Sequence, residues 1–257
     1  MMDSRGIVVS RRTLALLEKI GTPTLAGMLT HRMGFRNNYM TGILPLAVKP
    51  DQRMVGRART LRFIPLREDL VKAQYESLTG SPHRSALEGV NPGDVLVIDA
   101  GGCMEAAVLG DMFTRRVKFR GARGIVIDGV VRDLSMIRQV GLPVFARGMH
   151  GSGIPRALMS VGLDEPVRCG DVPVVPGDIL VGDEDGVVVI PPQLAADLAK
   201  QAYEHEQEEE WARMKLAEGA SLHEVYPPTP EKRKEFEAWL AAYKRAAASR
   251  PRPRGQR

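Results

Sequence analysis

The sequence predicts an α/β fold in which helices pack on mixed sheets. Segments with helical spacing of apolar residues alternate with short apolar runs that are rich in β-branched residues. Hairpin-like stretches interrupt this alternation, which a purely parallel sheet would not accommodate. We therefore expect an α/β sandwich with mixed sheets, followed by a helical extension at the carboxyl end.

The first part of the chain predicts three helices and two strands. Residues 12–20 have apolar side chains at helical spacing, and GTPTLAGML (21–29) contains a break followed by a second helix. The alternating segment MVGRARTLRFI (54–64) predicts a strand, and 67–78 predict another helix. PGDVLVIDAGG (92–102) then predicts a turn, a strand and a glycine exit.

The central part of the chain continues the β/α alternation. Four elements are expected here, namely helices over 111–121 and 133–141 and strands over 124–128 and 142–147. PGDILVGDEDGVVVIPP (176–192) again uses Pro-Gly-Asp to enter a strand. Its turn from Asp183 to Gly186 predicts a hairpin, and the Asp183/Asp185 pair fits an ordinary turn.

A long polar helix is expected after Pro192, ending at Gly219, and a last amphipathic helix follows the YPPTP break. The Glu-rich face of the long helix and an apolar patch at Trp211, Met214 and Leu216 favour docking on another subunit. The expected domains are a main domain that includes the long helix (1–219), a helical extension (220–245) and a disordered basic tail (246–257).

The net charge of +5 is concentrated at the carboxyl end. From Lys244 onward there are six basic and no acidic residues, so the preceding chain has a net charge of −1. We therefore expect no direct nucleic-acid partner. No signal peptide and no run of roughly 18 apolar residues is visible, so a cytoplasmic protein without a membrane partner is expected. Isolated Cys103 and Cys169 suggest neither a disulfide framework nor a zinc site.

Residues 128–133, DGVVRD, place three charged side chains directly after a buried apolar run. Loops at the carboxyl ends of strands commonly face ligands, which suits Arg132 and Asp133 for ligand contact. The alternative is structural, with Asp133 capping the next helix and Arg132 as a surface charge. Asp128 is expected to accept backbone N–H bonds. The five histidines show no ligand spacing and are expected to be structural or exposed.

The upstream segment GGCMEAAVLGDMFTRR (101–116) favours the functional interpretation, because its small residues allow close backbone approach. Its Asp111 completes an Asp-x20-Arg-Asp pattern that resembles the signature of the RraA-like superfamily. That superfamily contains regulators of ribonuclease activity and class II 4-hydroxy-4-methyl-2-oxoglutarate/4-carboxy-4-hydroxy-2-oxoadipate aldolases. GTPTLAGML, VGRARTL, GIVIDGVVRD and GDEDGVVVIP are also similar to segments of the family, so the resemblance covers roughly residues 12–219.

The resemblance implies a swivelling-domain-type sandwich with a metal-dependent site for a 2-oxo acid. Such lyases stabilise an enolate through a lysine Schiff base or a divalent cation, and no lysine lies in the candidate loops. Asp133 would be the direct ligand of Mg²⁺ or Mn²⁺. Arg132 would bind the substrate carboxylate, and Asp111 would hold a metal-bound water and move protons. Backbone amides would bind the same anion, namely those of Gly110, Asp111, Met112 and Phe113.

The resemblance also implies a homotrimer or a dimer of trimers, in which Glu206 or Glu209 of a neighbouring subunit reaches the waters of the metal. Aldolase members have an acidic residue three positions after the metal-binding aspartate, and this chain has Met136 there. The expected function is a class II pyruvate aldolase that cleaves 4-hydroxy-2-oxo acids and also decarboxylates oxaloacetate. The alternative is a non-catalytic, protein-binding inhibitor of an RNA-degrading endonuclease.

Overall fold

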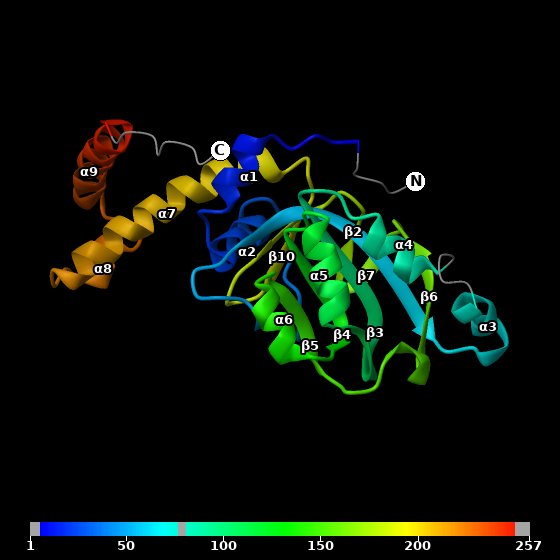
Figure 1. Cartoon of the computed structure of the whole chain (residues 1–257). Helices are drawn as coiled ribbons and strands as arrows, with labels where there is room; N and C mark the ends of the chain where they lie inside the picture. The colour runs from blue at the N-terminus through cyan, green and yellow to red at the C-terminus, as the bar shows by residue number, and fades with distance from the viewer. Residues whose placement is uncertain (1–5, 77–80, 250–257) are drawn as a thin grey trace. The chain divides into compact units, whose positions relative to one another are not determined.

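The computed structural model describes residues 6–76 and 81–249. The chain forms two compact units, residues 1–200 and 201–257, and the boundary falls inside helix α7 (Ala195–Ala217). The first unit contains the sheet and the helices that pack on it (Figure 1). Among the described residues, no helix is both long enough and apolar enough to span a membrane.

The first unit is built on a mixed sheet in the order β1-β5-β4-β3-β2-β9-β10, with β6 also paired to β2. The β2/β3, β3/β4 and β4/β5 pairs are parallel, and the remaining pairs are antiparallel. The strands are β1 (Leu44–Ala47), β2 (Met54–Pro65), β3 (Asp94–Leu109), β4 (Gly124–Val131), β5 (Val144–Met149), β6 (Leu158–Leu163), β9 (Ile179–Gly182) and β10 (Val187–Ile190). The predicted mixed sheet is therefore confirmed. A separate small ribbon pairs β7 (Val167–Cys169) with β8 (Val172–Val174).

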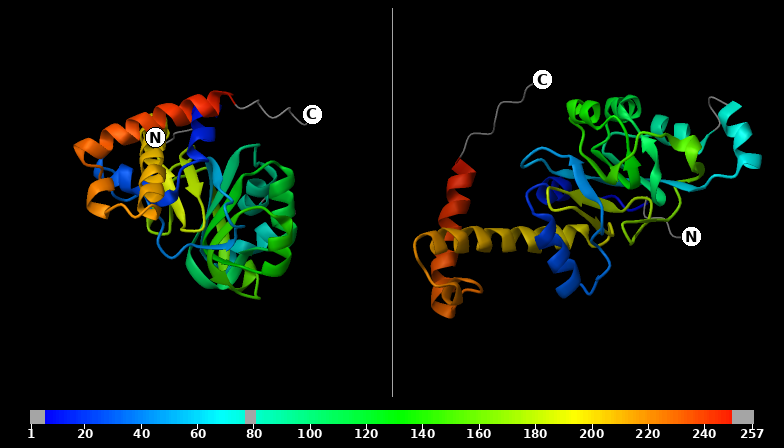
Figure 2. Two further views of the ribbon diagram at one scale, coloured as in Figure 1. Left: turned by 90° about the vertical axis from the view of Figure 1, so that its left-hand side faces the viewer. Right: turned by 90° about the horizontal axis from the view of Figure 1, so that it is seen from below.

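Helices cover both faces of the sheet. The helices of this unit before α7 are α1 (Arg11–Leu17), α2 (Thr22–His31), α3 (Glu68–Glu76), α4 (Pro82–Glu88), α5 (Asp111–Phe119), α6 (Leu134–Val140) and the short 3-10 helix η1 (Ile154–Arg156). Figure 2 shows α5 and α6, in green, on one side of the sheet and the N-terminal helices, in blue, on the other. This placement agrees with the predicted α/β sandwich with mixed sheets.

Alternate residues of the central strands enter two separate cores. Leu96 and Ile98 of β3 pack with Val117 of α5 and Ile137 of α6, whereas Val95 and Val97 join a second core with residues of β7–β10. This division follows from the two-residue period of side chains along a strand. Because both faces are covered, β4 is buried along its whole length, as its continuous apolar run predicts.

Most predicted elements are present, and the differences lie where the sequence pattern is weak. β3 continues to Leu109, past the glycine exit predicted at Gly101 and Gly102, although both glycines adopt positive φ values (61° and 73°). β1, α4 and β6–β8 were not predicted. The hairpin at Asp183 to Gly186 is confirmed by the antiparallel pairing of β9 with β10.

The second unit contains most of α7, the short α8 (Leu222–Val225) and α9 (Pro230–Ser249). Its small core joins Trp211 to Val225 and Phe236. The expectation that Trp211 belongs to an exposed patch is wrong, because the side chain is 0% exposed within its own chain, while Met214 and Leu216 are partly exposed. Helix α9 runs four residues into the predicted tail, and 250–257 lie outside the described residues.

Candidate functional site

The candidate site lies where β3 and β4 end side by side. The two strands are parallel, and Leu109 is opposite Val131 at their carboxyl ends. The backbone N–H of Arg132 donates to the carbonyl of Leu109 at 3.0 Å. This bond holds the segment that starts α5 next to the segment that starts α6. The two loops predicted to act together, 110–113 and 132–133, are therefore neighbours in the structure.

Two glycines leave space for the Arg132 and Asp133 side chains. A Cβ atom at Gly110 would lie 2.8 Å from Asp133 Oδ2 and 3.3 Å from Arg132 Nε. A Cβ atom at Gly153 would lie 3.3 Å from Arg132 Nη1. The guanidinium thus passes close to the backbone of both glycines, and a larger residue at either position would displace it.

Asp133 adopts a left-handed backbone conformation, with φ 58° and ψ 35°. It occupies the N-cap position of α6, but within the described chain its side chain makes no capping hydrogen bond. Its carboxylate is 45% exposed and contacts Arg132 Nε at 3.5 Å. The side chain of Asp133 therefore does not cap α6, and the structural alternative for this residue is wrong. A non-glycine residue held in this region is a feature that often marks functional sites.

The other predicted residues lie around the first turn of α5. Asp111 pairs with Arg115 at 3.3 Å, and Met112 is 72% exposed. Phe113 points into a cavity, whereas Gly110 caps the helix with backbone alone as far as the described residues show. The first N–H groups of a helix have no partners inside that helix, so this turn can bind an anion.

Asp128, the remaining charged residue of DGVVRD, has a structural role, as predicted. Asp128 is fully buried and accepts a hydrogen bond from the backbone N–H of Gly170 at 3.0 Å. Its other carboxylate oxygen pairs with Arg147. Both oxygens are thus engaged, and Asp128 is not a candidate ligand.

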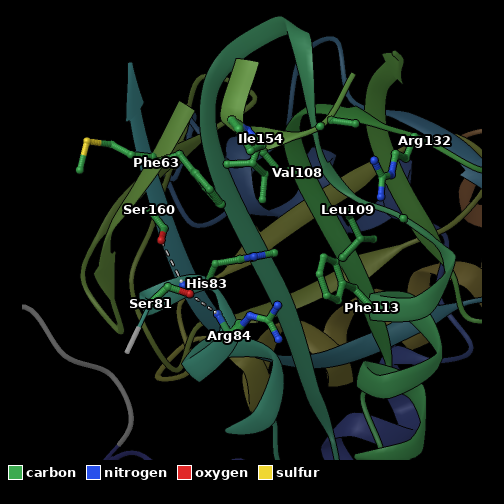
Figure 3. Close-up of a pocket in the computed structure, with 15 residues that line it drawn as sticks. Phe63, Ser81, His83, Arg84, Val108, Leu109, Phe113, Arg132, Ile154 and Ser160 are labelled. Carbon is green, nitrogen blue, oxygen red and sulfur yellow. Dashed lines mark hydrogen bonds between the residues drawn. The ribbon is translucent and has the colours of Figure 1, made fainter. Parts of the chain in front are cut away.

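A cavity of about 230 Å³ opens beside this edge of the sheet (Figure 3). Arg132, Gly110 and Phe113 contribute to its wall, while Asp111, Met112 and Asp133 are outside its lining. The remaining wall comes from β2, α4, β3, η1 and β6 and is largely apolar, comprising Phe63, Ser81, His83, Arg84, Ala107, Val108, Leu109, Gly153, Ile154, Pro155, Met159 and Ser160.

His83 of α4 is the titratable residue that sequence reasoning missed. Its side chain extends into the cavity, and the residue is 6% exposed (Figure 3). Its ring makes edge contacts with Phe113 (centroids 5.0 Å apart) and Phe63 (5.6 Å). Burial lowers the pKa of His83 to about 4, so the ring is neutral at neutral pH. The sequence does contain a signal for helix α4, because Ser81 is a capping residue, Pro82 follows it and Gly89 ends the helix.

A family model described as RraA-like: Aldolase/RraA matches residues 15–189. The chain belongs to the RraA-like family. A protein of Halalkalibacterium halodurans named "Putative 4-hydroxy-4-methyl-2-oxoglutarate aldolase" is 30% identical over 71% of this chain and 82% of its own length. The crystal structure of RraAS2 from Streptomyces coelicolor, described as an unusual member of the RNase ES inhibitor RraA protein family, is 35% identical. It matches with a TM-score of 0.71 over 81% of this chain and all of its own.

The crystal structure of an uncharacterized protein from Pseudomonas syringae is 26% identical to this RraA-like chain. Its TM-score is 0.75, and the match covers 85% of this chain and 94% of that protein. These matches confirm the predicted family and fold class.

Glu206 and Glu209, the carboxylates expected to act across a subunit interface, belong to the second unit. Glu209 accepts a hydrogen bond from the Tyr226 hydroxyl at 2.9 Å and pairs with Arg213 at 3.3 Å. Glu206 lies 3.8 Å from Arg213. Any role in a neighbouring site would require Glu209 to exchange these partners, and its predicted role stays a prediction.

The donor set at the site fits a hydrated Mg²⁺ or Mn²⁺ ion. Asp133 offers a half-exposed carboxylate, a hard oxygen ligand of the kind these ions prefer. Within the described residues no group of three His, Cys, Asp or Glu side chains is placed to hold a metal. A site with one protein ligand would rely on water and substrate oxygens, which Mg²⁺ accepts because it retains waters. Met136, with 40% exposure, adds no charged ligand.

Proposed function

We propose that this RraA-like protein is a divalent-metal-dependent lyase that cleaves 4-hydroxy-2-oxo acids to pyruvate by a retro-aldol reaction. Decarboxylation of oxaloacetate would be a side activity at the same site. The observation that carries the proposal is the placement of Arg132, which lines the cavity while its guanidinium lies beside the half-exposed carboxylate of Asp133. This arrangement can hold the carboxylate end of a small substrate next to a cation site.

Each group of the site would have a separate task. Arg132 would bind the substrate carboxylate with two parallel N–H donors, and the first turn of α5 would donate backbone N–H groups to the same anion. Asp133 would hold the divalent cation, which when bound would stabilise the negative charge that develops on the 2-oxo oxygen. Asp111 would orient a water molecule and move the proton.

The reaction breaks the C3–C4 bond of the substrate. The proton of the 4-hydroxyl leaves to a base, the C4 oxygen becomes a carbonyl, and the electron pair of the broken bond passes to the pyruvate fragment. Protonation of that fragment at C3 completes pyruvate. Arg132 holds the fragment throughout, because its carboxylate is unchanged by the reaction.

A pyruvate-release assay tests the proposal. The purified chain is given a panel of 4-hydroxy-2-oxo acids and oxaloacetate, with Mg²⁺, with Mn²⁺ or with a chelator. We expect pyruvate release that depends on the metal and exceeds the rate of the metal alone. Failure of every substrate with both metals, in protein whose fold is verified by circular dichroism, would refute the lyase.

A second candidate is inhibition of an RNA-degrading endonuclease through protein binding. The similarity to RraAS2 favours it, as does Met136 at the position where aldolase members have an acidic residue. A cleavage assay with a ribonuclease of the E type and a fluorescent RNA distinguishes the two functions. Inhibition that survives Asp133→Asn and occurs without pyruvate release would favour the regulator.

The proposal includes assembly as a homotrimer or a dimer of trimers with sites shared between subunits. Its support is the glutamate-rich helix α7, which carries Glu206 and Glu209. Mixing Asp133→Ala subunits with subunits that carry alanine at both glutamates should regenerate some intact sites. A monomer with full activity in sedimentation experiments would contradict this assembly.

A further inference from the structure

The cavity wall contains a buried polar atom that lacks a partner. Within the described residues, three buried side-chain atoms have no hydrogen-bond partner, namely Arg59 Nε, His83 Nε2 and Gln207 Oε1. Of these three residues, His83 alone lines the cavity. An unsatisfied buried polar atom is unfavourable, so Nε2 needs a partner that the described chain does not supply, either a water molecule or a ligand in the cavity.

The surrounding contacts determine which hydrogen bond Nε2 can make. A hydrogen bond to the Val108 backbone favours the protonated form of the ring, which identifies the backbone group as the carbonyl. Since Nε2 has no partner, we assign that bond to Nδ1, which then carries the proton of the neutral ring. Nε2 is therefore an acceptor.

The hydroxyl oxygens of the two neighbouring serines of the wall already accept hydrogen bonds. Ser160 Oγ accepts the backbone N–H of His83 at 3.3 Å, and Ser81 Oγ accepts the backbone N–H of Arg84 at 3.2 Å (Figure 3). The edge contacts with Phe63 and Phe113 hold the imidazole ring between them. His83 thus presents one fixed acceptor between the rings of Phe63 and Phe113, and Arg84 is the charged neighbour in this part of the wall.

We propose that Nε2 of His83 accepts a hydrogen bond from a hydroxyl group of the bound substrate and selects hydroxylated acids over analogues that lack the hydroxyl. The carboxylate end of this ligand is bound at Arg132, a step that rests on the proposed function. Val108 and Ile154, which line the same cavity, would contact the carbon chain between these two ends (Figure 3). A carbonyl or carboxylate oxygen facing Nε2 would meet an acceptor and be rejected.

Direct binding measures this selection without catalysis. The matched probes are 4-hydroxy-2-oxopentanoate and 2-oxopentanoate, which differ by one hydroxyl, titrated into the full chain in the presence of a chelator. We expect the unaltered protein to bind the hydroxylated probe about tenfold to a hundredfold more tightly, because the analogue leaves Nε2 unpaired. In His83→Phe the two affinities should agree to within about threefold.

The control is His31→Phe, which makes the same replacement at an exposed position and should retain the full preference. A second measurement uses the unaltered protein, so the test does not require that His83→Phe folds. The ¹⁵N resonance of His83 Nε2 should move upfield when the hydroxylated probe binds and stay in place with 2-oxopentanoate. Equal affinity for the two probes, no binding of either, or a preference that survives in His83→Phe would overturn the inference.

The binding experiment can succeed or fail independently of the lyase proposal. A binding preference that depends on His83, without pyruvate release when metal is added, would support the inference and reject the lyase. Pyruvate release from the hydroxylated probe without any binding preference would reject the role of His83 and support the lyase. If a water molecule is the sole partner of Nε2, the two probes should bind with equal affinity, which is one of the results that would overturn the inference.

Discussion

Two aspartates at strand ends of the same sheet have opposite surroundings. Asp183, after β9, accepts hydrogen bonds from the Thr22 N–H (2.9 Å) and the Thr22 hydroxyl (2.6 Å) and pairs with Arg53 (2.9 Å). Asp133, after β4, contacts Arg132 at 3.5 Å and is 45% exposed, against 12% for the side chain of Asp183. The first carboxylate is saturated by its own chain. The second retains coordination capacity, as a ligand-binding group requires.

The largest expected effect is on turnover, from Asp133→Asn. Asn tolerates the left-handed backbone and has the same shape, so the change removes the negative charge with little effect on folding. We expect a loss of metal-dependent pyruvate release of roughly a thousandfold, because the cation supplies several kcal/mol. Calorimetric titration with Mn²⁺ should show the loss of binding, while the thermal unfolding midpoint stays within about 2 °C. Wild-type turnover in this variant would remove Asp133 from the metal site.

The next effect is on substrate binding, from Arg132→Lys. Lysine keeps the positive charge but lacks the planar pair of donors that matches a carboxylate. We expect kcat/KM to fall by an amount equivalent to about 2–4 kcal/mol. Arg116→Lys, also on α5, is the matched control and should retain activity, since its partner is the exposed Glu88, which has no role in the site. Near-normal kinetics for Arg132→Lys would exclude contact between the guanidinium and the substrate.

The saturated carboxylate should show the opposite behaviour. Asp183→Asn removes the negative charge that pairs with Arg53 and replaces one acceptor oxygen by an NH₂ donor. The free energy of unfolding should therefore fall by roughly 2–3 kcal/mol. Turnover per folded molecule should be unchanged, because Asp183 stabilises the start of α2. Urea unfolding and the pyruvate assay, performed on the same preparation, measure both quantities. A large loss of turnover with normal stability would invalidate the comparison.

The smallest expected effect is a loss of folding stability at acidic pH. The pKa of His83 is lowered in the folded chain to about 4 from its usual 6.5, so below pH 6.5 the unfolded chain binds more protons. The stability contributed by the neutral ring is present above pH 6.5 and is lost as the pH falls toward 4. Between pH 6.5 and 5.5 the loss should be about 1 kcal/mol. Urea unfolding at both pH values should show a smaller loss in His83→Gln, and equal losses would place His83 outside this titration.

The position of the charged loop at the end of β4 could be predicted from the sequence because it depends on local order, whereas the metal and carboxylate roles of its residues come from the family resemblance and stay predictions. DGVVRD follows a continuous apolar run and precedes a helix, so the strand end, the loop and the exposed charges are encoded within a few residues. The position of Gly110 next to Asp133 follows from parallel pairing of β3 with β4, which the alternation of strands and helices also indicates.

The cavity could not be predicted because it depends on contacts between distant segments. His83 lies on the seven-residue helix α4, which is too short to show a clear apolar period, and its neighbours Phe63 and Phe113 come from β2 and α5. The antiparallel pairing of β6 with β2 also brings Ser160 to this wall. The spacing of histidines in the sequence contains no information about these contacts.

The error at Trp211 has a similar cause. An apolar group on a polar helix indicates that something covers it, but the pattern does not identify the covering segment. Here Val225 and Phe236, which follow later in the same chain, pack with Trp211. The apolar spacing in α9 predicted that helix correctly, whereas its packing with Trp211 within the second unit required the structure.

The left-handed backbone at Asp133 also determines which substitutions a lineage can sample at this position. Asn and Gly adopt the conformation readily, whereas β-branched residues would strain the loop. Single-nucleotide changes convert Asp codons to Asn or Gly codons, and either exchange would remove the charge and keep the course of the chain. An ancestral catalyst could thus become a pure binding protein, or the reverse, through mutation of one codon without refolding of its surface.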